Sequence, residues 1–244
     1  MEESNAATCL VAGYKQVVAN RYLIDPLPAP GPAVLGGEVA HHLGAVLRVR
    51  VGERVRLFDG RGHACEARVD AVHKRGIEVW CEPTTSSTRP VPRVHVAFAV
   101  PKLQRAEWLL EHGTELGIDT FHPLATRRAR PQGERPERWH RLLAAAAGQC
   151  DRDWLPELRP LRSLAEFLAD PLLPAARFVG EQGGPALRAT NTDAVLLVGP
   201  EGGFDADERA AVAAAGFVRC SFGRHVLRTE TAAFTGAAIL LHGT

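Results

Sequence analysis

The chain has 244 residues, enough for one large or two modest domains, and its hydrophobic content of 45% is ordinary for a globular protein. The net charge of +1 argues against a protein that is basic over its whole surface. No apolar run approaches the roughly 20 residues that cross a bilayer. The scattered cysteines form no Cys-x-x-Cys pair, which indicates neither a metal site nor a disulfide framework and favours a reducing cytoplasm. They are Cys9, Cys65, Cys81, Cys150 and Cys220.

Residues 20–83 are predicted to form a small β-rich domain. Residues 1–19 before it lack the basic start and apolar centre of a signal peptide. Residues 55–58, 64–69 and 76–80 alternate as half-buried strands do, and Asp59-Gly60 marks a hairpin turn between the first two. A helix is expected over 38–49. Arg48 lies near its end and either contacts RNA phosphate or belongs to a solvated face.

Residues 82–93 contain threonines, serines and prolines typical of a linker, and a second domain is predicted over 94–244. It opens with a strand over 94–100, a helix over 104–116 that Gly117 ends, and a strand over 121–124. Lys102 lies between the first strand and its helix. The run Arg127, Arg128 and Arg130 follows a strand, where α/β sheets place ligands. It is predicted either to bind RNA phosphate or to be a solvated charge run.

A further helix is expected over 135–150, a short helix over 163–168 and a strand over 177–181. The stretch that organises the rest of the chain follows. Residues 194–198 form a short, β-branched apolar run, typical of a buried strand. They stop at Gly199-Pro200-Glu201-Gly202-Gly203, in which Gly202 and Gly203 can adopt positive φ and let a ligand approach the backbone. Asp205 then begins a helix as its N-cap.

This glycine run is neither a Walker A loop nor Gly-x-Gly-x-x-Gly, and taken alone it is equally a tight turn without a ligand. A second segment favours a ligand site. Residues 218–222 are predicted to form a strand that Gly223 ends, and residues 227–231 lead into an apolar helix over 232–241. Two glycine-ended strands, each followed by a helix, are expected to bring two loops side by side at one edge of a parallel sheet.

The segments LVGPEGGF (197–204) and FGRHVLRTETAA (222–233) resemble the signature of the ribosomal RNA small subunit methyltransferase E family, which belongs to the SPOUT superfamily. The segments HHLGAVLRVRVGERVRLFDGRG, VHVAFAVPK and GTELGI extend the resemblance over most of the chain. It implies an α/β fold: a carboxyl-terminal SPOUT domain with a parallel sheet and a trefoil knot, after an amino-terminal PUA-like β-barrel that binds RNA. True knots are rare in proteins, so the knot rests on the resemblance alone.

The resemblance also implies a reaction, a cofactor and partners. The reaction is methylation of N3 of a uridine in 16S ribosomal RNA of the small ribosomal subunit. S-adenosylmethionine (SAM) is the methyl donor, no metal is required, and a homodimer completes the site. Two alternatives stay open: another SPOUT RNA methyltransferase, acting on a ribose 2′-hydroxyl or a different base, and a non-catalytic RNA-binding protein.

Carried over by motif, the site residues fall into three groups. Those expected to bind the cofactor are Leu197, Val198, Gly199, Pro200, Glu201, Gly202, Gly203, Phe222, Gly223, Val226, Leu227, Arg228 and Thr229. Those expected to act in catalysis are Glu201, Arg228 and Glu230, although Glu201 could instead cap a helix and Glu230 could pair with Arg228. Those expected to contact RNA are Arg48, Lys102, Arg127, Arg128, Arg130, Gln149 and Arg152, of which Gln149 and Arg152 could instead lie at the dimer contact.

Overall fold

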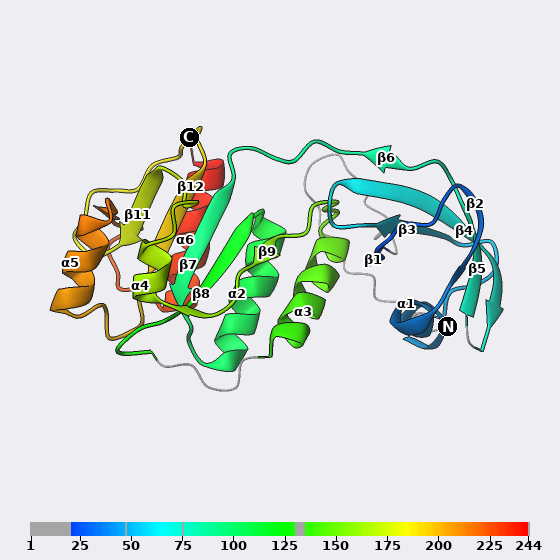
Figure 1. The fold of residues 1–244 in the computed structure, drawn as a ribbon, viewed down its shortest axis with the longest axis horizontal. Helices are drawn as coiled ribbons and strands as arrows, with labels where there is room; N and C mark the ends of the chain where they lie inside the picture. Colours follow the sequence, from blue (N-terminus) through cyan, green and yellow to red (C-terminus); the bar gives the residue numbers. More distant parts are fainter. Residues whose placement is uncertain (1–20, 47, 75, 130–134, 244) are drawn as a thin grey trace, which may run out of the picture. The chain divides into compact units, whose positions relative to one another are not determined.

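The computed structural model describes residues 21–46, 48–74, 76–129 and 135–243. Residue contacts divide the chain into two units (Figure 1). The first comprises the described residues up to Ser87 together with Asp151–Asp153, and the second comprises the described residues of 88–150 and of 154–244. The expected RNA-contacting residue Arg130 lies outside the described residues.

The first unit is built on a six-stranded sheet with the order β1-β3-β4-β5-β2, to which β6 adds by pairing with β4. Val55, Leu57, Val69 and Val79 point inward from alternate positions and are at most 1% exposed. The predicted strands correspond to β3, β4 and β5, whereas β1, β2 and β6 were not predicted. The strands are β1 (Arg21–Leu23), β2 (Gly31–Leu35), β3 (Arg54–Phe58), β4 (His63–His73), β5 (Gly76–Cys81) and β6 (Thr85–Ser86).

The helix predicted over 38–49 is shorter and irregular in the structure. It consists of α1 (Gly37–His41) and a π-helical turn η1 (His42–Val46). Arg48 adopts φ of 54°, in the left-handed region that a right-handed helix cannot include. The prediction of a regular helix to residue 49 was therefore wrong at its carboxyl end.

The segment Asp151–Asp153 joins the first unit through a buried arginine. Arg21, whose side chain is 3% exposed, forms ion pairs with Asp151 and with Asp153. Arg56 also reaches Asp153 at 3.3 Å, and the amide of Gly62 donates to the Asp153 carbonyl at 3.0 Å. A buried guanidinium needs such partners, because an uncompensated buried charge is costly. These contacts explain why a segment that follows the helix α3 (Pro136–Gln149) in the chain belongs to the unit of residues 21–87.

The second unit is a seven-stranded parallel sheet with the order β10-β8-β7-β12-β11-β13, to which β9 adds beside β8. The central strand β12 occupies the predicted residues, and all of its side chains are buried. The strands are β7 (Val94–Ala99), β8 (Thr120–Ala125), β9 (Glu157–Leu158), β10 (Arg162–Ser163), β11 (Ala176–Gly180), β12 (Ala194–Val198) and β13 (Val218–Cys220).

Helices cover both faces of this sheet, as expected for parallel strands that are apolar throughout (Figure 1). Leu196 faces the core shared with α2 and α6, whereas Val195 and Leu197 face the core shared with α4 and α5. The helices are α2 (Leu103–Leu116), α3 (Pro136–Gln149), α4 (Leu164–Leu168), α5 (Ala206–Ala214) and α6 (Thr229–His242). None of the helices in the described ranges combines the length and the apolar character needed to cross a bilayer.

The carboxyl-terminal segment returns from the edge of the sheet to its middle. β13 is an edge strand, and residues 221–228 connect it to α6, which packs against β7 and β12. The predicted strand over 218–222 ends earlier, at Cys220, and the predicted helix over 232–241 begins earlier, at Thr229. Phe222 leaves the strand because its ring packs where Gly180 and Gly236 have no Cβ: a Cβ there would lie 2.7 and 2.9 Å from the ring. The trefoil knot stays a prediction.

Candidate functional site

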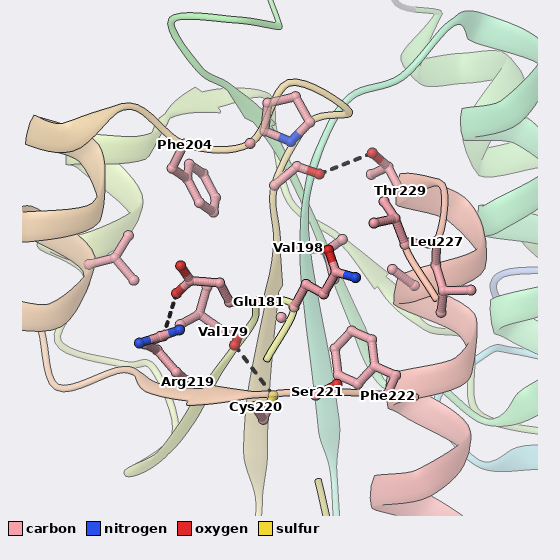
Figure 2. Close-up of a pocket in the computed structure, with 18 of the residues that line it drawn as sticks. Val179, Glu181, Val198, Phe204, Arg219, Cys220, Ser221, Phe222, Leu227 and Thr229 are labelled. Atoms are coloured by element: carbon pink, nitrogen blue, oxygen red, sulfur yellow. Dashed lines mark hydrogen bonds and ion pairs between the residues drawn. The ribbon is translucent and has the colours of Figure 1, made fainter. Parts of the chain in front are cut away.

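Two loops at the carboxyl edge of the parallel sheet enclose a pocket of about 500 Å³ (Figure 2). The glycine loop, residues 199–205, connects β12 to α5, and the second loop, residues 221–228, connects β13 to α6. The sequence predicted that these loops lie side by side, and the structure brings them together. Predicted cofactor residues that line the pocket are Val198, Gly199, Pro200, Glu201, Gly203, Phe222, Gly223, Val226, Leu227 and Thr229.

Three predicted cofactor residues do not line this pocket. Leu197 belongs to β12, and its fully buried side chain packs in the core below α5. Gly202 faces Arg128, which donates a hydrogen bond to the Gly202 carbonyl. Arg228 is exposed and serves as the N-cap residue of α6. Their direct contact with a cofactor therefore stays a prediction that the pocket does not support.

Local backbone geometry shapes the glycine loop. Gly203 adopts φ of 67° and donates to the Pro200 carbonyl at 2.8 Å, which closes a tight turn. Gly202, which was predicted to share this freedom, is not among the positive-φ residues. Gly199 lets the ring of Phe204 approach, since a Cβ on it would lie 3.0 Å from that ring. Asp205 then caps α5 through a capping box with Glu208, so Glu201 does not cap this helix.

The end of β11 forms a third wall of the pocket that the sequence did not predict. Glu181 lines the pocket and forms an ion pair with Arg219 at 2.6 Å (Figure 2). Its amide donates to the Cys220 carbonyl at 2.8 Å. Burial raises the pKa of the Cys220 thiol to about 12, so the thiol stays protonated and donates to the Val179 carbonyl at 3.4 Å. The strand itself was expected, but its place between β12 and β13 was not.

The remaining lining residues come mainly from α5 and the segment after it. Phe204, Val212 and Phe217 make this side of the pocket apolar. The guanidinium of Arg209 is held by the Phe204 carbonyl at 2.6 Å. The pocket thus combines apolar walls with a few charged groups and with backbone exposed at glycines, the character expected of a site for a small organic cofactor.

Arg105 of α2, which the sequence did not single out, contacts both acidic residues of the predicted catalytic set. Its Nη1 lies 2.9 Å from Oε1 of Glu201, and its Nε lies 3.6 Å from Oε1 of Glu230. Glu230 is 7% exposed, and its Oε2 has no hydrogen-bond partner within the described ranges. The pairing of Glu230 with Arg228 that was considered from the sequence is not formed, because Arg105 takes that place.

The residues predicted to contact RNA are distributed over several places. Lys102 is exposed at the N-cap of α2. This helix follows β7, which lies beside β12, the strand that leads into the glycine loop. Arg127 is partly neutralised, because its Nη1 lies 2.9 Å from carboxylate oxygens of both Asp205 and Asp207. Arg128 holds the Gly202 carbonyl, as noted. Gln149 is exposed at the end of α3, whereas Arg48 and Arg152 belong to the first unit.

Comparison with known proteins agrees with this architecture. Residues 87–241 match the family described as RNA methyltransferase domain, and residues 35–79 match the RNA methyltransferase PUA domain. The ribosomal RNA small subunit methyltransferase E of Synechocystis sp. is 31% identical over 241 residues, which cover 94% of this chain and 78% of that protein. The protein of the same name from Mycobacterium tuberculosis is 32% identical over 235 residues, which cover 89% of each chain.

Solved structures show the same fold. The ribosomal RNA small subunit methyltransferase E from Neisseria gonorrhoeae bound to S-adenosyl methionine superposes with a TM-score of 0.82, at 26% identity over 90% of this chain and 95% of that one. A Legionella pneumophila methyltransferase in complex with SAM gives 0.83, at 28% identity over 91% and 96% of the two chains. The family match, the full-length relatives and the pocket between the two signature loops agree: the chain belongs to the ribosomal RNA small subunit methyltransferase E family.

Proposed function

We propose that the protein transfers a methyl group from SAM to N3 of a uridine in 16S ribosomal RNA. The observation that supports this most directly is the pocket that both signature loops line. Its volume of about 500 Å³ lies within the range of small-molecule sites. Its apolar side chains suit a purine ring, and the charged groups of Glu181, Arg209 and Arg219 suit hydroxyls and a carboxylate.

Methylation at N3 requires removal of an imide proton and an in-line approach of the nitrogen to an electrophilic methyl group. SAM supplies that methyl group as a sulfonium. The protein then has to orient the base and accept or offset charge, which is chiefly a positioning task and needs no metal. Glu230 is suited to accept a proton or a hydrogen bond, because its Oε2 lacks a partner among the described residues. Glu201, which lines the pocket, is a second candidate to accept the imide proton, and the exposed Arg228 at the same edge would offset the negative charge that develops on the base.

RNA is proposed to approach the second unit at the carboxyl edge of its sheet. Lys102, Arg128 and Arg228 are exposed on the segments around the glycine loop. Arginine and lysine contacts to phosphate would position the RNA, and the target uridine would leave its stack to enter the site. The PUA-like domain, proposed to span 20–83, would hold the RNA through Arg48. Arg127, Arg130, Gln149 and Arg152 complete the proposed set, and the catalytic domain would span 94–244.

A homodimer is proposed to form through α2 and α6. From Ala232 to Leu241 α6 is largely apolar, which is typical of a covered helix, yet Phe234 and Ile239 are only partly buried. Trp108 of α2 is 40% exposed and stacks on His112 with a centroid distance of 4.4 Å, beside Phe234 at 5.8 Å. A second copy would cover this apolar face. A cytoplasmic location is proposed with the ribosomal substrate.

Two measurements test the function. Isothermal titration calorimetry of the purified protein should show saturable SAM binding, and its absence would refute the cofactor assignment. Nucleoside mass spectrometry of 16S ribosomal RNA from a strain that lacks the gene should show loss of 3-methyluridine. Loss of a 2′-O-methylated nucleoside or of another methylated base would favour a different SPOUT reaction. An unchanged nucleoside profile combined with RNA binding would favour a non-catalytic RNA-binding protein.

A further inference from the structure

Arg105 occupies a specific place between the two loops of the pocket. It lies in the first turn of α2, where its amide donates to the Lys102 carbonyl at 2.8 Å, so its backbone is fixed by the helix. From this position its guanidinium reaches Glu201 of the glycine loop at 2.9 Å and Glu230 at 3.6 Å. Glu230 lies in the first turn of α6, directly after the second loop. A single side chain on a third element therefore bridges the two segments that enclose the pocket.

Burial distinguishes the two ion pairs. The Glu201 side chain is 52% exposed, and an exposed pair of this kind contributes little to stability by itself. The Glu230 side chain is only 10% exposed, and within the described ranges Arg105 is the cation that pairs with it. Without that cation a buried carboxylate would be left uncompensated, which is strongly unfavourable. Arg105 is thus anchored on the buried side by Glu230 and can hold the exposed side, Glu201, in place.

We infer that Arg105 is a positioning residue for cofactor binding, which fixes the glycine loop against α6 and so sets the width of the SAM pocket. The inference rests on the proposed function and adds a residue to it. Arg105 itself does not line the pocket, whereas Glu201, Gly199 and Gly203 do. Its effect on SAM must therefore pass through the loop rather than through a contact of its own.

Because SAM is positively charged, a positioning role of Arg105 and a direct electrostatic effect of its charge predict opposite changes in SAM affinity. SAM carries a sulfonium, an ammonium and a carboxylate, for a net charge of +1, so removal of a nearby cation would by Coulomb's law favour its binding. Loss of a positioning contact should instead weaken SAM binding. S-adenosylhomocysteine, which lacks the sulfonium charge, should respond to the loss of Arg105 as SAM does if position is what matters.

The experiment measures binding of SAM and S-adenosylhomocysteine by calorimetry, without RNA, to the full-length protein and to Arg105→Met. We expect Arg105→Met to bind both ligands up to about fivefold more weakly, the effect of losing one largely exposed ion pair that holds the loop. Arg138→Met is the matched control. Arg138 pairs with Glu107, which lies on α2 as Arg105 does. Neither Arg138 nor Glu107 lines the pocket. Its affinity for both ligands should equal that of the wild type.

Two further variants test the bridge. Glu201→Gln should weaken SAM binding, and Arg105→Met/Glu201→Gln should bind no more weakly than Arg105→Met alone, because both changes break the same contact. Arg105→Met/Glu230→Gln removes the buried charge with its partner and should restore the melting temperature but not the SAM affinity.

Unchanged SAM affinity in Arg105→Met, tighter SAM binding, or additive effects of the Arg105 and Glu201 changes would each overturn the inference while the proposed function stands. Failure of the wild type to bind SAM would overturn both.

Discussion

Thr229 donates a hydrogen bond from its hydroxyl to the Gly199 carbonyl at 3.0 Å, across a separation of 30 residues in the chain (Figure 2). Thr229 begins α6 and Gly199 begins the glycine loop, so this bond joins the two signature segments directly. The Thr229 residue is 2% exposed, which shields the bond from water. Both residues line the pocket, and the contact therefore sets the relative position of two of its walls.

Replacing Thr229 with valine should separate these walls. The variant keeps the shape of the side chain but leaves the partly buried Gly199 carbonyl without its donor, which costs about 1 kcal/mol. We expect a lower melting temperature and a SAM dissociation constant raised at least about tenfold. Thr229→Ser retains the hydroxyl and should bind SAM nearly as the wild type does. Equal affinities of the valine and serine variants would show that the bond does not shape the pocket.

The backbone of Gly203 gives a second prediction. Its φ of 67° is one that a β-branched side chain rarely adopts, although no atom would collide with a Cβ there. Gly203→Val should therefore strain the loop by about 1–3 kcal/mol and abolish measurable SAM binding. Gly52→Val is a matched control in the first unit, because Gly52 has φ of 89° and equally open surroundings. It should lose comparable stability and keep its SAM affinity.

Charge on the apolar face of α2 and α6 should disrupt the proposed homodimer. Trp108→Glu and Phe234→Glu would each place a carboxylate where we expect a second copy to exclude water. Size-exclusion chromatography with light scattering should show a dimer for the wild type and monomers for these variants. Trp80→Glu changes a tryptophan of β5 with a similar exposure of 44% and should leave the oligomeric state unchanged. A wild-type monomer at micromolar concentration would contradict the proposal.

A buried histidine pair in the second unit should make stability depend on pH. Burial, then the neighbouring His95 and Arg162, lower the pKa of His122 from 6.5 to about 3. Arg162 donates to Nδ1 of His122 at 2.9 Å, and Nε2 of His122 lies 3.2 Å from Nδ1 of His95, so the neutral form is the one bound. The pKa of His95 is lowered as well, chiefly by burial. Both histidines are therefore neutral in the folded protein at pH 7.

The sign of the effect follows from linkage. The unfolded chain binds a proton at His122 below about pH 6.5 and the folded protein does not, so the stabilising contribution is complete above that pH and is lost as pH falls toward 3. One such group contributes a slope of up to about 1.4 kcal/mol per pH unit. Urea unfolding between pH 7 and 5 should show a shallower slope for His122→Asn than for the wild type. Identical slopes would contradict the assignment of a neutral His122.

Lys102 and Arg127 should differ in their contribution to RNA binding. Lys102 is exposed and forms no ion pair within the described part of the chain, whereas Arg127 faces two carboxylates. Lys102→Ala should weaken RNA binding and lower the slope of log affinity against log salt by about one. Arg127→Ala should change that slope less, because its charge is already compensated. Filter binding of a 16S RNA fragment over a salt series measures both.

The central part of the site could be predicted from the sequence because its signals are local. The apolar run of β12, the glycines that follow it and the N-cap Asp205 each describe a residue's relation to its own chain neighbours. The second loop could be identified by its resemblance to a family motif, which is again a pattern of about ten neighbouring residues. For the same reason the start of α6 was misplaced: Thr229 and Glu230 enter the helix because they pack against the glycine loop and α2.

The positions of Glu181 and Arg105 at the site depend on the order of the strands in the sheet, which only the tertiary structure decides. The place of β11 between β12 and β13 brings Glu181 into the pocket, and no local pattern reports that order. Arg105 precedes Glu201 by 96 residues, and it reaches the site because β7, which leads into α2, pairs directly with β12. Contacts between residues so far apart in the chain form only when the strands pair in register and the helices cover both faces of the sheet. Neighbouring residues in the chain determine the conformation of each loop, and the packing of the sheet determines which side chains meet between the loops.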